Sequence, residues 1–160
     1  MRRALPAVLV LLVVPGAAAD SPLELVPTVG LRASSPLGIS GSLAVTAGRT
    51  RVDPQFCTHE PLGPSAQIEA GIGGGQVAFG IAAVCRDSSW IPTVGGLALR
   101  GVYARTWGSP WGADAGRSFL GAYAEVYVYR VSARVGILKP VGARAAPRDT
   151  LVTFGLGFGF

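Results

Sequence analysis

LVTFGLGFGF, residues 151–160, is the stretch that decides the fold class of this 160-residue chain. Every second residue is apolar or aromatic, and the residues between them are threonine or glycine. Successive side chains of a β-strand leave opposite faces, so this period of two predicts a strand with one bulky face and one small face. A strand of a lipid-facing β-barrel requires this pattern, with apolar side chains outward and small or polar ones inward.

The alternation that ends on Phe160 resembles the C-terminal strand of bacterial outer-membrane β-barrels. In that class the barrel-assembly machinery recognises an alternating last strand that ends on an aromatic residue. The resemblance therefore implies that the bulky face of this strand is an assembly signal, which comprises Phe154, Leu156, Phe158 and Phe160. A secreted soluble β-sandwich or a lipocalin-like binding protein is the alternative fold.

The first residues of the chain have the pattern of a secretory signal peptide. Arg2 and Arg3 precede an apolar run from Ala4 to Pro15, and three alanines offer a cleavage site before Asp20. We expect a cleaved signal peptide at residues 1–19 and one barrel domain at residues 20–160. An uncleaved membrane anchor is the alternative, but the apolar run is short for a span of about 20 residues.

The composition agrees with a protein whose solvent is partly lipid. Hydrophobic residues make up 49% of the chain and charged residues only 14%, which is too apolar for an ordinary soluble surface. The formal net charge is +5, but the basic residues are scattered along the sequence, and a nucleic-acid interface needs them clustered on one face. The expected partners are therefore outer-membrane lipid and the assembly machinery, with no nucleic acid, and we expect a monomer.

Eight segments show the period-two alternation over roughly the 9–11 residues that a tilted barrel strand requires, with one or two shorter. They predict an all-β fold, an eight-stranded antiparallel up-and-down transmembrane β-barrel, similar to the small OmpA/OmpX-type and opacity-type surface barrels. Between the second and third segments we expect an irregular loop at residues 50–65, and Gly74-Gly75 is expected to form a tight turn. The eight segments are Leu23–Ala33, Gly38–Arg49, Ala66–Gly73, Gln76–Cys85, Val94–Thr106, Ser118–Val128, Val131–Lys139 and Leu151–Phe160.

Three acidic and three basic residues fall on the predicted inward faces. An eight-stranded barrel is just wide enough for side chains to fill, and buried charges are tolerated only when they are paired. We therefore predict a lumen charge network, centred on Arg100, Glu125 and Arg134 of neighbouring strands; a chance balance of charges is the alternative interpretation. The six residues are Glu24, Arg32, Glu69, Arg100, Glu125 and Arg134.

The sequence offers weak candidates for catalysis and for metal binding. Some barrel enzymes act on lipid A with a histidine and a serine, but here His59 is the only histidine, with Glu60 and Ser65 near it in the expected loop. Zinc needs three or four ligands, and Cys57, His59 and Glu60 form a loose cluster without a fourth. We expect no catalytic site, no metal and no cofactor, and a lipid A enzyme remains the alternative function.

Cys57 and Cys85 are expected to form a disulfide, because an exported protein with two cysteines and no metal constellation usually pairs them. Counting strands back from Phe160 places both cysteines at the periplasmic rim, Cys57 in the expected loop and Cys85 at the end of the fourth strand. The resemblance implies a location in the cell outer membrane and a structural or surface-interaction role. A barrel of this size has no pore of useful width.

Overall fold

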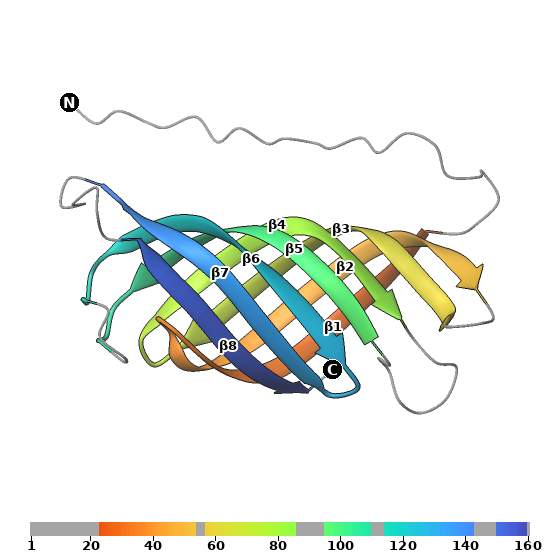
Figure 1. Ribbon diagram of the computed structural model, residues 1–160, viewed down its shortest axis with the longest axis horizontal. Helices are drawn as coiled ribbons and strands as arrows, with labels where there is room; N and C mark the ends of the chain where they lie inside the picture. Colours follow the sequence, from red (N-terminus) through yellow and green to blue (C-terminus); the bar gives the residue numbers. More distant parts are fainter. Residues whose placement is uncertain (1–22, 54–56, 86–94, 110–113, 143–149, 160) are drawn as a thin grey trace.

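The residues that the structure describes form a closed antiparallel β-barrel of eight strands, which confirms the predicted all-β, eight-stranded up-and-down architecture (Figure 1). The computed structural model describes residues 23–53, 57–85, 95–109, 114–142 and 150–159. Within these ranges no helix is long and apolar enough to cross a membrane. The strands are β1 (Leu23–Ser34), β2 (Gly38–Asp53), β3 (Cys57–Gly71), β4 (Gly74–Cys85), β5 (Gly95–Thr106), β6 (Ser118–Val128), β7 (Val131–Val141) and β8 (Leu151–Gly159).

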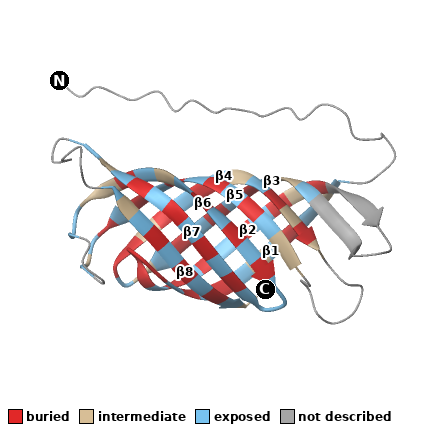
Figure 2. Cartoon of the chain, viewed as in Figure 1, coloured by how far each residue is buried: buried red, intermediate tan, exposed pale blue. Residues whose placement is uncertain are grey.

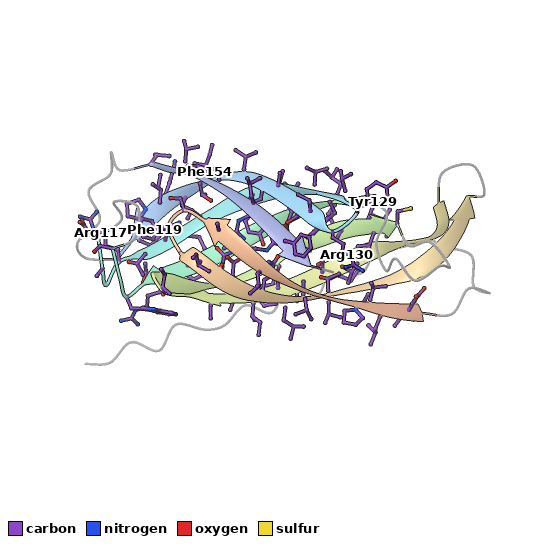
Figure 3. The ribbon with its side chains drawn as sticks, turned by 90° about the horizontal axis from the view of Figure 1, so that it is seen from below. Arg117, Phe119, Tyr129, Arg130 and Phe154 are labelled. Atoms are coloured by element: carbon purple, nitrogen blue, oxygen red, sulfur yellow. The ribbon has the colours of Figure 1, made fainter. Side chains whose placement is uncertain are left out.

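Each strand pairs with its neighbours in sequence, and the pairing of β8 with β1 closes the barrel. The end where β1 begins and β8 stops is called the terminal end, and the opposite end is called the loop end. In Figure 3, Arg117 and Phe119 lie at the loop end, whereas Tyr129 and Arg130 lie at the terminal end.

Burial alternates residue by residue along the strands, as the checkerboard of Figure 2 shows. The side chain of Leu99 on β5 is 56% exposed on the outer face, and that of the next residue, Arg100, is 2% exposed in the lumen. On β8, Phe154 points outward with 59% exposure, and the small residues Thr153 and Gly155 face inward. The period of two in the sequence therefore assigned the described residues of these strands to the correct faces.

The prediction of an irregular loop at residues 50–65 is wrong. β2 continues to Asp53 and β3 begins at Cys57, so the two strands pair beyond the ends of β1 and β4. Prolines suggested the loop because proline cannot donate a ladder hydrogen bond. Pro61 lies beyond the last residues that pair with β4, and Pro64 lies where the β2–β3 ladder is interrupted, so neither interrupts a complete ladder.

The tight turn predicted at Gly74-Gly75 is also displaced. Both glycines belong to β4, and the chain turns at Ile72-Gly73. Gly73 donates its N–H to the carbonyl oxygen of Leu37 at 2.9 Å and accepts a hydrogen bond from the N–H of Trp107 at 3.0 Å. Contacts with two other connections therefore fix the position of this turn.

The connection between β1 and β2 folds into the loop end of the barrel. Leu37 is 0% exposed, and Ser34 and Pro36 are also fully buried, although turns usually lie at the surface. The N–H of Ser35 donates to the carbonyl oxygen of Phe154 on β8 at 2.9 Å, which ties the turn to the strand that closes the barrel. An apolar residue in this turn thus closes part of the lumen.

Candidate functional site

Two buried carboxylates organise the lumen. Glu125 on β6 accepts hydrogen bonds from the guanidinium of Arg32 on β1, from Arg100 Nη1 on β5 at 2.9 Å and from the hydroxyl of Tyr127 at 2.7 Å. Both arginines are almost completely buried, with 4% and 2% exposure. Glu125 is therefore the counter-charge for two arginines, Arg100 on the neighbouring strand β5 and Arg32 on β1 across the lumen.

The second carboxylate, Glu69 on β3, is bound by Arg134 on β7. Arg134 Nη1 donates to Glu69 Oε2 at 2.6 Å and Arg134 Nη2 donates to Glu69 Oε1 at 3.0 Å, which makes a bidentate pair. The hydroxyls of Ser40 and Ser34 and the amide of Gln76 also donate to Glu69, at 2.5, 3.2 and 3.0 Å. The carboxylate oxygens are thus surrounded by donors.

Tyr123 and Gln67 join the two carboxylate groups into one network. Gln67 Oε1 accepts hydrogen bonds from Arg100 Nη1 at 3.0 Å and from the Tyr123 hydroxyl at 2.8 Å. The guanidinium carbon of Arg134 lies 5.2 Å from the centroid of the Tyr123 ring, within the range of a cation–π interaction. The side chains of seven strands, β1 to β7, therefore meet in the middle of the barrel.

The structure brings together five of the six residues of the predicted charge network. Arg100 and Glu125 of its predicted centre bind each other, but Arg134 has a different partner. Glu125 and Arg134 are direct cross-strand neighbours on β6 and β7, yet Arg134 binds Glu69 on the opposite wall. Arg32 and Arg100 already occupy the Glu125 carboxylate, and a barrel of eight strands is narrow enough for an arginine to reach across.

The sixth residue, Glu24, lies away from this network. It faces inward and is half-buried, but it is eight residues from Arg32 along β1, a separation of roughly 26 Å at about 3.3 Å per strand residue. The six predicted charges therefore do not all belong to one network. The network itself contains three arginines and two glutamates.

The sequence did not identify several residues as members of the network. The period of two places the amphipathic side chains of Tyr123 and Tyr127 on the inward face but predicts no partner for either. Ser65, considered as a nucleophile, accepts hydrogen bonds from Arg100 Nε at 3.2 Å and Nη2 at 2.9 Å. The signal that could have found such residues is the repetition of serine, glutamine and tyrosine at inward positions, since polar groups in a lumen must be paired.

Glycines on β8 make room for the arginine side chains. A Cβ atom at Gly155 would lie 3.0 Å from Arg134 Nε, and one at Gly157 would lie 3.1 Å from Arg32 Cγ. Both distances are tighter than ordinary van der Waals contact. The small face of the C-terminal strand is therefore the wall against which two lumen arginines pack.

Apolar clusters cover the charge network on both sides. Towards the loop end the cluster comprises Ala78, Val102, Ala104, Phe119, Tyr123 and Leu138, and towards the terminal end it comprises Val26, Ala82, Val84, Ala98 and Tyr127. On β5 the order is visible in three successive inward residues, because Arg100 lies between Ala98 and Val102. The described part of the lumen thus has its charges in the middle and apolar side chains towards both ends.

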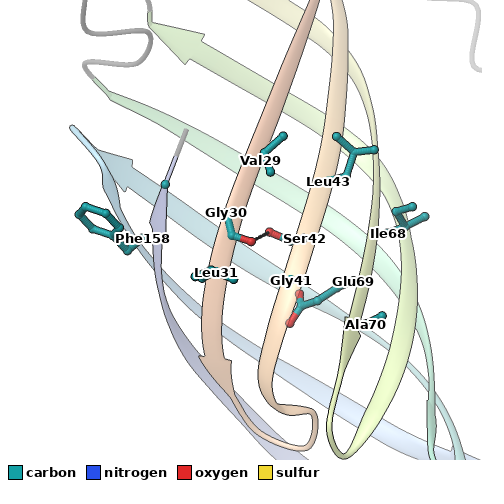
Figure 4. Close-up of a pocket in the computed structure, with 11 residues that line it drawn as sticks. Val29, Gly30, Leu31, Gly41, Ser42, Leu43, Ile68, Glu69, Ala70 and Phe158 are labelled. Carbon is teal, nitrogen blue, oxygen red and sulfur yellow. Dashed lines mark hydrogen bonds between the residues drawn. The ribbon is translucent and has the colours of Figure 1, made fainter.

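The outer face carries a shallow groove of about 600 Å³ over β1, β2, β3 and β8 (Figure 4). Its lining includes the small residues Gly41 and Ala70 and the larger residues Leu31, Leu43 and Phe158. Its lining is almost entirely apolar and therefore continues the character of the outer surface around it.

The structure places the two cysteines at the same end of the barrel. β3 begins at Cys57 and β4 ends at Cys85, and because these strands are antiparallel neighbours both positions lie at the terminal end. Cys57 is in a strand and not in the expected loop. The side chains of Cys57, His59 and Glu60 lie outside the described residues, as does Phe160, so the disulfide and the assembly signal stay predictions. Among the residues that are described, no cluster of metal-binding side chains occurs.

Comparisons with known proteins give no relative for this chain. No family model, no curated protein sequence and no solved structure matches it.

Proposed function

We propose that this protein is an exported outer-membrane β-barrel that acts as a structural or surface-interacting element and conducts no solutes. The observation that carries the proposal is the apolar outer face. Leu31, Ile68, Leu99, Val135 and Leu156, on five different strands, are each between 56% and 67% exposed. Exposed apolar patches on soluble monomers rarely exceed a few hundred Å², whereas a lipid-facing barrel needs an apolar band all the way round.

The ends of the outer face support the same proposal. Trp107 is 57% exposed beyond the loop end of β5, and Tyr129 is 58% exposed in the β6–β7 turn at the terminal end. Tryptophan and tyrosine are enriched where a membrane meets water, because their rings are amphipathic. Aromatic residues at both ends therefore fit a barrel whose middle lies in hydrocarbon.

The interior supports a role without conduction. The charge network lies between the two apolar clusters, and the β1–β2 turn buries Pro36 and Leu37 at the loop end. Transport through a barrel requires a continuous polar path, as in wide porins. The proposed role therefore depends on the outer surface and on the two ends of the barrel, and not on its interior.

A pair of arginine substitutions tests the membrane location. Leu99 is near the middle of β5 and Leu120 is near the loop end of β6, and their exposures are almost equal, at 56% and 55%. We expect Leu99→Arg to lower the free energy of unfolding in phosphatidylcholine vesicles by about 2 kcal/mol, and Leu120→Arg by less than about 1 kcal/mol, because the cost of arginine falls from the midplane to the interface. Urea titration followed by heat-modifiable mobility measures both.

Equal effects of the two substitutions would contradict the proposal, because an outer face in water treats both leucines alike. The purified mature chain should also float with the vesicles and become resistant to protease. Recovery of the exported protein in the soluble fraction without detergent would refute the membrane location directly.

The proposed export also predicts the state of the two cysteines. We expect one bridge between Cys57 and Cys85, since both lie at the terminal end and an oxidising compartment favours pairing. Mass mapping of the exported protein without reductant should recover the two cysteine peptides as one linked species. Two cysteines that react with an alkylating reagent in fresh membranes would exclude the bridge.

A further inference from the structure

The outward face of the barrel carries very few charges. Among the outward strand positions whose side chains are described, only Arg105 on β5 and Lys139 on β7 are charged, and both are exposed cations. The remaining outward positions are apolar, glycine, proline, serine, tyrosine or cysteine. Two cations among the described outward positions, with no described outward anion beside them, call for an anionic partner.

Both cations lie near the loop end, and only β6 separates their strands. Arg105 is the partner of Ser118 on β6, and Lys139 is the partner of Leu120, two residues further along the same strand. Since neighbouring strands are about 4.8 Å apart, β5 and β7 are separated by roughly 10 Å, a distance that the two long side chains can span. They can therefore reach one ligand between them.

Two hydroxyl groups lie at this position, and a tryptophan ring lies at the same end of the barrel on the β4 side of β5. The hydroxyls of Tyr103 and Ser118 lie 3.0 Å apart on the outer face, between the two cations. Trp107 is two residues beyond Arg105, and its ring lies over Gly75, where a Cβ atom would be 2.8 Å from Trp107 Cη2. Exposed tyrosine and tryptophan mark the level of lipid headgroups, so the cations face the headgroup layer and not the acyl chains.

We propose that Arg105 and Lys139 form a binding site for the phosphate of an anionic lipid headgroup, with one further donor from the hydrogen-bonded hydroxyl pair of Ser118 and Tyr103. The inference rests on the proposed membrane location. Arginine binds phosphate oxygens through two parallel hydrogen bonds, and lysine adds a compact positive charge. The described outward strand positions offer no carboxylate to compete for either cation, so the phosphate of a neighbouring lipid supplies the counter-charge.

Lipid selectivity measured by electron spin resonance tests this site. The mature chain is reconstituted in phosphatidylcholine vesicles with a trace of spin-labelled phosphatidic acid, or of phosphatidylcholine carrying the same label. We expect wild type to retain phosphatidic acid preferentially, and the preference to fall about fivefold for each of Arg105→Gln and Lys139→Gln, since one basic residue at a membrane surface contributes about 1 kcal/mol. Arg130→Gln, at the terminal end, is the matched control and should leave the preference unchanged.

The outcomes separate this inference from the proposed function. Co-flotation with pure phosphatidylcholine vesicles is measured first for every variant. If wild type does not insert, both the membrane location and the lipid site are overturned. If wild type and the double variant Arg105→Gln/Lys139→Gln insert equally well and show the same preference for phosphatidic acid, only the lipid site is overturned. If Arg130→Gln loses as much of this preference as the two site variants do, the lipid site is also overturned, because the effect is then a general attraction of cations for anionic lipid. Release of the labelled lipid by inorganic phosphate would likewise overturn a headgroup site, because it would show a site for the free ion.

Discussion

Replacing Glu125 by glutamine should lower the free energy of unfolding by about 3–5 kcal/mol, because it leaves buried arginines without their counter-charge. Arg32 and Arg100 both bind this carboxylate in the middle of the lumen. The other network acid, Glu69, is already paired with Arg134. Glutamine has nearly the same volume as glutamate, so the change removes the charge and leaves the packing in place. Urea unfolding in detergent or vesicles, followed by heat-modifiable mobility, gives the difference from the transition midpoint.

Two further variants make the Glu125 experiment specific. Asp114→Asn removes a carboxylate that is paired with Arg117 but is 66% exposed, and the loss should stay below about 1 kcal/mol. Adding Arg32→Gln to Glu125→Gln should recover part of the stability, since one uncompensated cation is then removed, and the pair of changes should be non-additive. A Glu125→Gln midpoint equal to that of wild type would show that the carboxylate is hydrated and does not neutralise the arginines.

Gly121→Ala should cost at least about 3 kcal/mol, the upper end of the usual range for overpacking. Gly121 faces inward on β6, and a Cβ atom there would overlap the carbonyl oxygen of Ile137 on β7. Backbone cannot move aside as a flexible side chain does, so the two strands would have to separate. Gly63 and Gly80 stand in the same relation to the carbonyl oxygens of Ala47 and Leu99. Glycines at these inward positions allow the strong curvature of a small barrel.

A neighbouring glycine supplies the control for Gly121. Gly101 on β5 faces outward, and the nearest atom to a Cβ there is the carbonyl oxygen of Phe79 at 3.8 Å. Gly101→Ala should leave the free energy of unfolding unchanged or raise it by up to about 1 kcal/mol, because alanine restricts the unfolded chain. The same urea titration compares the two variants. Equal stabilities would mean that β6 and β7 do not approach as closely as described.

The alternation in the sequence was sufficient to predict which face of the sheet each strand residue occupies and to predict an all-β barrel. The reason is that the direction of a side chain depends only on whether its position in the strand is odd or even. Strand ends were less predictable. The turn at Ile72-Gly73 is held by Leu37 and Trp107, which are distant in sequence, and the prolines of β3 occupy places where its ladders stop or are interrupted. Local propensity could not have revealed either arrangement.

The partners in the lumen were less predictable than its composition. Inward charges could be identified one strand at a time, but the choice of partner depends on which carboxylates are already occupied and on the width of the barrel. Arg134 illustrates the point, since it lies opposite Glu125 in the ladder and binds Glu69 across the lumen. Likewise, the gap between the first two predicted strands, residues 34–37, implies a turn there but gives no indication that Leu37 is buried inside the barrel.

The cross-lumen ion pairs have a consequence for the kinetics of folding. Arg32 and Glu125 are 93 residues apart in sequence, and Glu69 and Arg134 are 65 residues apart, so each pair joins strands that become neighbours across the lumen only when the sheet curls up. Contacts between distant parts of a chain form late, after the entropy of loop closure has been lost. Interactions that are absent from the transition state change the unfolding rate and leave the folding rate almost unaltered. We therefore expect these pairs to slow the unfolding of the closed barrel and so to lengthen its lifetime.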